Sequence, residues 1–436
     1  MKSIENRRRC DVLIIGAGII GLSTAYHMKQ SAHDLNVLVV DRNAAPAQGD
    51  TAKNQGGVRD VFTSDVNRLL AKSSIDFWRQ VQYEKHVNLN LELVGYLWLL
   101  SESRFKTFES YESGMRRQKI RLRTFEREEL KDMIPDLVLD PESEQSRMVG
   151  MPSIYKGVQG LDCGTVSPDL IAKFYEDEFK KLGGEVESGT EAKSLRLEAK
   201  RKLGLPGEPY VWQEKVFSGV ETNRGFIGAD TVVLATGVRA PLLLDQLGVD
   251  CLIKPQKRQI FPVHGKPLEG LLNAKGFNEH DTIPMTILPR NGVILRPLRK
   301  EKGFWVQAGD GLGRSFGLEE EPVAEEPFFN HNIYPILTEY LPCFTNLRSA
   351  NSWAGFYDLN SVDSTPIITR VGNLIMAVGM SGSGLMKSDA VGRVATAIFE
   401  GKEEATLFGD GRISTSQLGL TNRSVGKEEL ESDSLS

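Results

Sequence analysis

Three glycines near the start of the chain have the spacing that lets a backbone turn approach a phosphate group. Gly16, Gly18 and Gly21 form the pattern GxGxxG, and Asp41 stands 20 residues beyond the last of them. In such a pattern the first glycine makes a tight turn, the second admits a pyrophosphate, and the third lets a helix pack closely on a strand. The helix N-terminus offers N–H groups to the phosphates, and the acid accepts hydrogen bonds from ribose hydroxyls. The pattern predicts a dinucleotide-binding turn.

Short apolar runs flank this turn on both sides. Residues 12–15 and 37–40 are fully apolar, which is typical of buried parallel strands. Between them Leu22, Ala25 and Met28 recur at helical spacing. The region therefore predicts a strand, a glycine turn, a helix and a second strand.

A second glycine-rich turn lies near the other end of the chain. Residues 374–378 form another apolar run, Gly379–Gly384 follows, and residues 385–399 have a helical pattern. A further strand at residues 231–234 leads to Thr236 and Gly237. Two such turns, far apart in the chain, favour a long ligand held at both ends, and a helix N-terminus would stabilise charge on a reduced flavin. The pattern favours FAD over NAD, with an unrelated glycine turn as the alternative.

The middle of the chain has a different pattern. Short alternating segments such as 293–296 and 304–307 predict a separate antiparallel sheet. Residues 197–214 are polar and are predicted to form a surface excursion, whereas residues 421–436 have the composition of a disordered tail.

Composition excludes several classes of protein. The 436 residues carry 53 basic and 58 acidic side chains, a net charge of −5, so no nucleic-acid partner is expected. The 4 cysteines and 6 histidines show no ligand spacing, so no metal is expected. No apolar run is long enough to span a bilayer. We expect a soluble cytoplasmic protein, with peripheral attachment to a membrane left open.

The ordered motifs resemble the FAD-dependent amine and amino-acid oxidoreductases of the D-amino acid oxidase-like superfamily. The resemblance runs from residue 11 to residue 401. Beyond the two glycine turns it rests on the segments 53–59, 160–162, 167–168, 229–237, 295–297 and 353–355. Residues 352–358 with Asn360 are similar to one mitochondrial branch, which is linked to respiratory complex I.

The resemblance implies an α/β fold in which a three-layer, Rossmann-type FAD-binding domain joins a second, mixed-sheet (α+β) substrate domain. The expected FAD-binding domain is discontinuous and comprises residues 1–90, 155–247 and 350–404, and the substrate domain comprises 91–154 and 248–349. The residues predicted to bind FAD are Gly16, Gly18, Ile19, Ile20, Gly21, Asp41, Arg42, Gln55, Gly56, Gly57, Thr236, Gly237, Ser381, Gly382, Ser383, Gly384 and Leu385.

Four residues are candidates for the catalytic site. Tyr357 lies in a segment that lines the substrate cavity in relatives, and Arg59 follows the loop beside the flavin. Arg296 has the bidentate geometry that suits a carboxylate. Lys387 stands one residue from the place of a carboxylate-binding lysine in sarcosine oxidases. The structural alternatives are a helix cap or an ion pair of Arg59 with Asp60 or Asp65, a packed Tyr357 ring and a structural Arg296.

Departures from the family pattern refine the expected chemistry. Ser383 stands where the family often has histidine, which speaks against a sarcosine-type substrate. Residues 353–365 contain no cysteine, so FAD is expected to be non-covalent. Gln307 replaces a lysine that activates oxygen in oxidases, which favours a dehydrogenase.

The expected function is oxidation of the C–N bond of a small amine or (N-substituted) amino acid, by hydride transfer to flavin N5. The electron acceptor stays open among oxygen, a quinone and a partner protein. The alternatives are an FAD-dependent 2-hydroxy-acid dehydrogenase, because the same fold does both, and an FAD-binding assembly factor for a respiratory complex.

Overall fold

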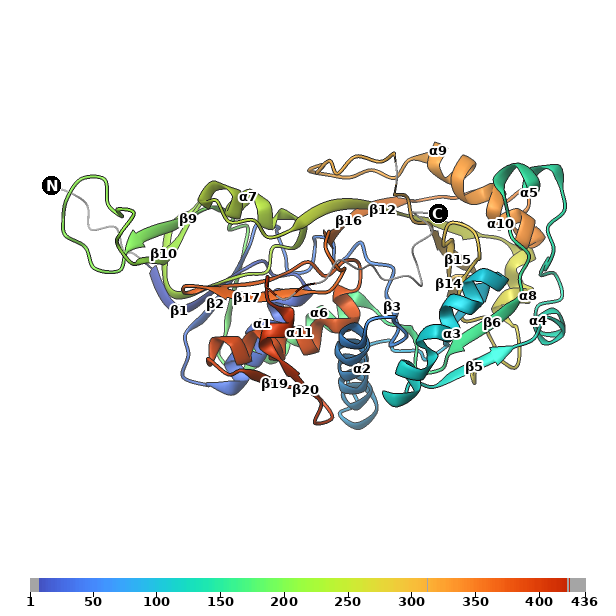
Figure 1. The fold of residues 1–436 in the computed structure, drawn as a ribbon, viewed down its shortest axis with the longest axis horizontal. Coiled ribbons are helices and arrows are strands. Elements are labelled where there is room, and N and C mark those ends of the chain that lie inside the picture. The colour runs from blue at the N-terminus through green and yellow to red at the C-terminus, as the bar shows by residue number, and fades with distance from the viewer. Residues whose placement is uncertain (1–7, 312, 422, 424–436) are drawn as a thin grey trace. The chain divides into compact units, whose positions relative to one another are not determined.

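The computed structural model describes residues 8–311, 313–421 and 423. They form two compact units, and the described part of the chain passes between the units four times. Unit 1 contains the described residues within 1–52, 168–255 and 357–426, and unit 2 contains residues 53–167 and 256–356. The ribbon is shown in Figure 1.

The core of unit 1 is a parallel sheet. Its strands are β1 (Arg8–Ile15), β2 (Val37–Asp41), β8 (Glu185–Ser188), β11 (Gly225–Leu234) and β18 (Leu374–Val378), with β17 (Ile367–Val371) antiparallel at one edge. The order is β17-β18-β11-β1-β2-β8. β1 therefore lies at the centre with β2 on one side and β11 on the other. In open sheets of this kind ligands bind beyond the carboxyl ends of the strands, where the strand order reverses.

Two further layers cover this sheet. The helices α1 (Ile19–Ser31), α6 (Pro168–Lys181) and α11 (Gly384–Phe399) pack together on one face. On the other face, apolar side chains of β1 and β2 pack against α7 (Ala240–Leu244) and against the hairpin of β9 (Ala192–Ala199) and β10 (Lys215–Thr222). This hairpin is joined to the sheet, because β10 pairs antiparallel with β11. The expected three-layer α/β architecture is confirmed. Beyond α11 lies a small hairpin of β19 (Glu404–Thr406) and β20 (Arg412–Ser414).

Unit 2 contains most of a mixed sheet with the order β16-β12-β15-β14-β13-β4-β6-β5. These strands are β4 (Tyr96–Leu100), β5 (Leu122–Phe125), β6 (Lys156–Gly160), β12 (Ile253–His264), β13 (Met285–Ile287), β14 (Ile294–Leu298), β15 (Gly303–Gln307) and β16 (Trp353–Asn360). β13 and β4 are parallel, whereas β14 and β15 form an antiparallel hairpin. β12 and β16 each continue from one unit into the other. The expected second, mixed sheet is thus present.

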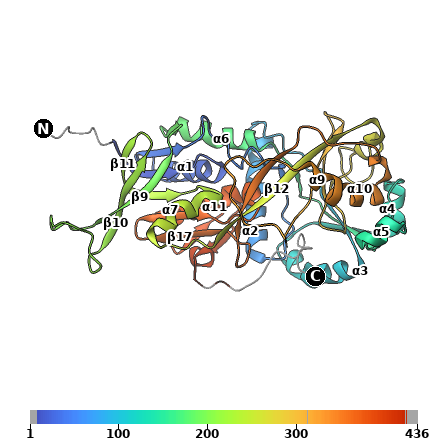
Figure 2. The same cartoon turned by 90° about the horizontal axis from the view of Figure 1, so that it is seen from above.

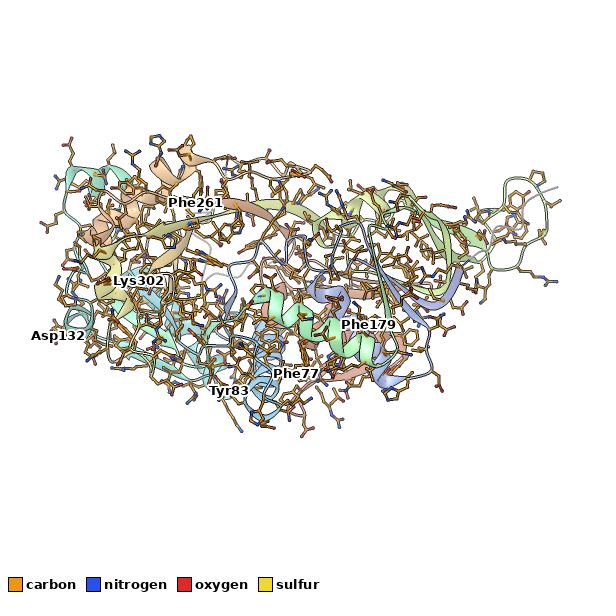
Figure 3. All side chains as sticks on the ribbon, turned by 180° about the vertical axis from the view of Figure 1, so that it is seen from behind. Phe77, Tyr83, Asp132, Phe179, Phe261 and Lys302 are labelled. Atoms are coloured by element: carbon orange, nitrogen blue, oxygen red, sulfur yellow. The ribbon has the colours of Figure 1, made fainter. Side chains whose placement is uncertain are left out.

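The helices of unit 2 and one short pair of strands complete the fold. The helices are α2 (Asp65–Arg79), α3 (Glu102–Arg117), α4 (Arg127–Met133), α5 (Glu144–Val149), α8 (Glu269–Leu272), α9 (Glu326–Phe328) and α10 (Tyr334–Tyr340), and the short pair is β3 (Gly57–Val58) with β7 (Gly164–Thr165). Figure 3 labels Phe261 of β12, which belongs to the apolar core of unit 2, and Phe179 of α6, which is fully buried in unit 1.

The division into units differs from the expected domains at four places. Residues 248–255 belong to unit 1 and residues 350–356 to unit 2, and two longer segments differ as well. Residues 53–90 and 155–167 belong to unit 2, although the sequence assigns them to the FAD-binding domain. The reason is that residues 57–58 pair with residues 164–165, while β6 adds to the second sheet through β4. Of the predicted disordered tail, residues 422 and 424–436 lie outside the described residues. No helix in the described part of the chain has the length and apolar character needed to cross a membrane.

Candidate cofactor-binding site

The first glycine turn connects β1 to α1 at the carboxyl edge of the unit 1 sheet. Gly16 has φ +105°, and a Cβ there would lie 2.5 Å from the carbonyl oxygen of Ala235. A Cβ on Gly21 would overlap the carbonyl oxygen of Gly16. Only glycine fits at these two positions, so the turn is tight and α1 packs closely on the strand, as the sequence predicts.

Gly18 has a different environment. A Cβ there would meet only the Thr51 hydroxyl, at 3.3 Å, so the Cα of Gly18 otherwise faces open space that a side chain would fill. The N–H of Ile19 donates to the same Thr51 hydroxyl at 3.1 Å. Ile20 lies in the first turn of α1, where N–H groups have no carbonyl partner within the helix. Sequence reasoning missed Thr51, because only the fold brings it to this helix end.

Asp41 ends β2 beside this turn. Its Oδ2 accepts the N–H of Ala17 at 2.7 Å, and its Oδ1 accepts the N–H of Asn43 at 2.8 Å. Each carboxylate oxygen has a second lone pair for a further donor. Asp41 therefore holds the glycine turn against β2, and its contact with ribose hydroxyls stays a prediction. The next residue, Arg42, is exposed.

The end of β11 contributes the neighbouring positions. The Thr236 hydroxyl is buried and has no hydrogen-bond partner among the described residues. Gly237 has φ +52°, and a Cβ there would meet nothing within 4 Å. Burial lowers the pKa of Arg239, and the positive charge of Arg42 lowers it further. An unpartnered hydroxyl, open space and two arginines are features that suit a polar, anionic ligand.

The second glycine turn connects β18 to α11. Gly382 has φ +81°, and a Cβ there would run into the ring of Tyr357. The N–H of Gly379 donates to Oδ2 of Asp358 at 2.8 Å, and the N–H of Asn360 donates to the Ser381 hydroxyl at 3.0 Å. The turn is thus fastened to the end of β16. Burial raises the pKa of Asp358 to about 6, and this carboxylate was not among the predicted site residues.

Lys387 lies in the first turn of α11 and is fully buried. Its Nζ donates to the Ser383 hydroxyl at 2.5 Å, and that hydroxyl donates to the carbonyl of Met380 at 2.8 Å. Leu385 is buried in the same turn. In this structure Lys387 supports the glycine turn, and its contact with a substrate stays a prediction.

The two glycine turns lie side by side. A Cβ on Gly384 would lie 3.9 Å from Ile20 Cδ1, at the N-termini of α11 and α1. Further along, the Ser23 hydroxyl donates to the carbonyl of Ser388 at 2.7 Å, and a Cβ on Gly392 would lie 2.8 Å from His27. The two helices therefore run parallel, with both N-termini at the same edge of one sheet (Figure 1).

Buried polar side chains hold this helix pair together. His27 Nε2 and Oδ1 of Asp389 are 2.7 Å apart, and Tyr175 of α6 donates to the same oxygen at 3.2 Å. Arg393 Nε donates to Oδ2 at 2.7 Å. Burial of the Asp389 carboxyl raises its pKa, but the contacts with His27 and Arg393 outweigh burial and hold the pKa below its usual range.

In unit 2, a buried arginine fastens the loop at residues 55–57. Arg296 donates through Nη1 to the carbonyl of Gln55 and through Nη2, at 3.3 Å, to that of Val166. Its guanidinium lies 4.7 Å from the ring centre of Trp305, to whose carbonyl the Gln55 amide donates at 3.1 Å. A Cβ on Gly56 would lie 2.5 Å from Nη1 of Arg296. The structure therefore brings together three of the predicted residues: Gln55, Gly56 and Arg296.

Two more predicted residues lie in or near this loop. Gly57 packs closely, since a Cβ there would lie 2.7 Å from the Tyr96 hydroxyl. Arg59 is buried, donates to the carbonyl of Val61 and lies 3.8 Å over the ring of Phe62. The sequence offered two acids, Asp60 and Asp65, as partners for Arg59. Of these, Asp65 pairs with Arg68.

In unit 1, two helix N-termini meet beyond the carboxyl ends of a parallel sheet, beside two glycines that face open space and a buried unpartnered hydroxyl. This arrangement fits the phosphates and sugars of FAD and defines a dinucleotide-binding protein. The chain belongs to the FAD dependent oxidoreductase family, whose model matches residues 11–398. It is an FAD-dependent oxidoreductase, and FAD is its cofactor.

Individual relatives agree with this assignment. FAD-dependent oxidoreductase domain-containing protein 1 of Xenopus laevis is 25% identical, over 90% of this chain and 80% of the relative. This confirms the branch indicated by residues 352–358. Sarcosine oxidase subunit beta of Rhizobium meliloti is 23% identical, over 88% of this chain and 82% of the relative. The crystal structure of L-proline dehydrogenase from P. horikoshii shares the fold, with a TM-score of 0.74, 22% identity, and coverage of 95% of this chain and 97% of that chain.

Proposed function

We propose that the chain oxidises the C–N bond of a small amine or (N-substituted) amino acid as a cytoplasmic dehydrogenase with non-covalent FAD. The observation that carries the proposal is the parallel packing of α1 and α11, which gathers both glycine turns at one sheet edge. The relatives named as sarcosine oxidase subunit beta and L-proline dehydrogenase support the substrate class.

When bound, FAD supplies a hydride acceptor, which no protein side chain provides. The N–H groups of Gly18 to Gly21 would hold the phosphates, and Asp41 would accept from the ribose. The helix end at Gly384 would favour negative charge on the far part of the cofactor. The protein's own contribution is to orient both partners and to exclude water.

Substrate contacts are assigned to four residues. A carboxylate substrate needs a fixed cation, and Arg296 and Arg59 are both buried guanidinium groups. Tyr357, packed on Gly382, would orient the amine or the carboxylate. Lys387 would contribute a charge from beneath the turn, through Ser383.

The choice of a dehydrogenase rests on Gln307. This side chain is neutral and 5% exposed on β15. A neutral amide gives no positive charge to stabilise superoxide, so reduced flavin is expected to react slowly with oxygen. A quinone or a partner protein then becomes the expected acceptor.

The test is reduction of the bound flavin under anaerobic conditions by a panel of amines, amino acids and 2-hydroxy acids. Bleaching of the flavin absorbance by an amine or amino acid, followed by slow return in air, is the expected result. If only 2-hydroxy acids bleach the flavin, the substrate is a 2-hydroxy acid and not an amine or amino acid. If no compound bleaches it, the result favours an FAD-binding assembly factor.

A second test concerns the FAD site itself. Gly18→Leu fills the open space beside Thr51, so we expect FAD affinity to fall by about tenfold or more, measured by flavin fluorescence. Gly270→Leu is the matched control, because a Cβ there meets nothing within 4 Å and Gly270 lies in unit 2, on α8. Equal losses in both variants would contradict the assigned site.

A further inference from the structure

The loop that joins β9 to β10 exposes a concentration of apolar side chains. We call residues 200–213 the hairpin tip. It extends beyond the strands of its own sheet in both Figure 1 and Figure 2. Leu203 and Leu205 are 51% and 54% exposed, Val211 is 94% exposed and Trp212 is 73% exposed. Scattered single apolar residues are ordinary on a protein surface, but a group of four on one loop indicates a contact surface.

The hairpin tip has its own hydrogen-bonded structure. The buried Gln213 side chain accepts the N–H of Tyr210 at 2.6 Å and donates to Oε1 of Glu208 at 3.2 Å. The Tyr210 hydroxyl donates to the carbonyl of Pro206 at 2.7 Å, and its ring stacks on Trp212 with centres 5.8 Å apart. The apolar side chains are therefore presented by an ordered loop, so little conformational entropy is lost on docking.

Cations lie at the base of the hairpin tip. Lys200, Arg201 and Lys202 are consecutive and exposed. Lys200 pairs with Glu214 and Lys202 with Glu198, each at 2.7 Å on the surface, where such pairs contribute little. Arg201 forms no ion pair with any residue that the structure describes.

The acid within the tip is turned inward. Glu208 Oε1 accepts the N–H of Leu203 at 2.7 Å in addition to the Gln213 amide. The outer surface of the loop thus combines apolar side chains with basic ones.

We propose that the hairpin tip docks on the surface of a lipid bilayer that contains anionic lipids. A tryptophan among aliphatic side chains is suited to the interface between headgroups and acyl chains. The run of three cations directly beside them complements anionic headgroups. The same basic run favours this occupant over an apolar groove on another protein. The inference is independent of the reaction that the flavin site performs.

The test uses the FAD-loaded full chain and two kinds of vesicle. One is pure phosphatidylcholine, and the other contains about one third phosphatidylglycerol. We expect co-sedimentation with the anionic vesicles, weakened by salt because exposed charges are screened. Trp212 is the most exposed of the 5 tryptophans, so its fluorescence should shift to the blue on binding. Trp212→Phe should remove that shift.

Matched substitutions separate the tip from surface hydrophobicity in general. Val211→Asp should reduce the partition into anionic vesicles by about tenfold or more, because it replaces an inserted apolar group by a charge. Val323→Asp, at a valine that is 70% exposed in unit 2, should leave the partition unchanged. Flavin absorbance and thermal unfolding confirm that both variants fold.

Two outcomes would overturn the proposal. The first is that the wild-type chain binds neither kind of vesicle at low salt. A protein partner would then be the better occupant of the hairpin tip. The second is that Val323→Asp weakens binding to the anionic vesicles as much as Val211→Asp does.

Discussion

Two groups of buried charges, one in each unit, are satisfied differently. In unit 1, the Asp389 carboxylate contacts His27, Tyr175 and Arg393, so the negative charge meets hydrogen-bond donors on both oxygens. In unit 2, Oδ2 of Asp60 and Nε of Arg296 are buried and have no hydrogen-bond partner among the described residues.

The pKa values follow this difference. Two aspartates with similar burial shift in opposite directions, since the pKa of Asp389 is held below its usual range while burial raises that of Asp60 to about 6. Burial likewise lowers the pKa of Arg296 to about 10. The paired network fixes a scaffold, namely the two helices whose N-termini must coincide. The incompletely paired groups near the loop at residues 55–57 can still form hydrogen bonds with a ligand. Buried polar groups without partners often mark a functional site.

The largest effect is expected from breaking the paired network. Asp389→Ala leaves Arg393 and His27 without their buried partner, so the free energy of unfolding should fall by about 3 to 5 kcal/mol. Denaturant titration measures this fall. Asp177→Ala, which removes the exposed pair with Lys173 on α6, should change it by less than about 1 kcal/mol. Similar small effects for both would mean that the network does not hold the helices.

The pH dependence of stability should sharpen the contrast. Because the pKa of Asp60 is raised in the folded state, its contribution to the free energy of unfolding is fully present below about pH 4. This contribution is lost as pH rises through about 6. Asp60→Asn removes this loss, so the variant should gain on the order of 2 to 3 kcal/mol relative to wild type between pH 4 and pH 7. The measurement is the unfolding free energy of both proteins across that range.

Charged neighbours and a control fix the interpretation of this experiment. Asp162 raises the pKa of Asp60 and Lys72 lowers it, so both must stay unchanged. Asp389, with its lowered pKa, contributes stability above the unfolded pKa and loses it only as pH falls through the lower folded value. A difference between wild type and Asp60→Asn that is flat with pH would contradict the assignment.

Arg296→Lys should have a smaller effect. Lysine keeps the charge but not the planar fork that reaches the carbonyls of both Gln55 and Val166. We expect a loss of about 1 to 2 kcal/mol in stability. We also expect a higher KM for a carboxylate substrate with little change in kcat. Arg299→Lys, at an exposed position just beyond β14, is the control for both readouts.

The smallest effect concerns the thiol beside Asp60. The Cys163 thiol donates to Oδ1 of Asp60 at 3.4 Å, which lowers the pKa of that carboxyl. Cys163→Ala should therefore move the pH-dependent loss of stability upward, by less than about one pH unit. Cys343→Ala, at a partly buried cysteine of the same unit, should leave it in place. A downward shift in Cys163→Ala would refute the hydrogen bond.

Local patterns were enough to predict four elements of unit 1. The apolar runs and glycines specify β1, α1, β18 and α11, because strand period, helix period and turn chemistry act over a few residues. The sequence predicted that both glycine turns hold one long ligand, but it did not predict the parallel contact of α1 and α11. This contact depends on Gly392 facing Ser23 and His27, which lie far away in the chain.

The loop at residues 55–57 shows where sequence reasoning fell short. Its relation to the flavin was inferred from family resemblance, which placed it in the FAD-binding domain. Its attachment to unit 2 is decided by Arg296 and by pairing between β3 and β7, and these are long-range contacts without a local signal. Thr51 and Asp358 were missed for the same reason, since an isolated threonine or aspartate carries no periodicity.

The fourfold passage of the chain between the units has a consequence for biosynthesis. β1 and α1 emerge from the ribosome well before α11, which packs on α1, and β18, which pairs with β11 in the same sheet. The early glycine turn must therefore persist without its partner helix until α11 has been translated. Unit 1 cannot be assembled as an autonomous N-terminal module, so a nascent chain halted before residue 374 should expose unpaired edges and depend on chaperones.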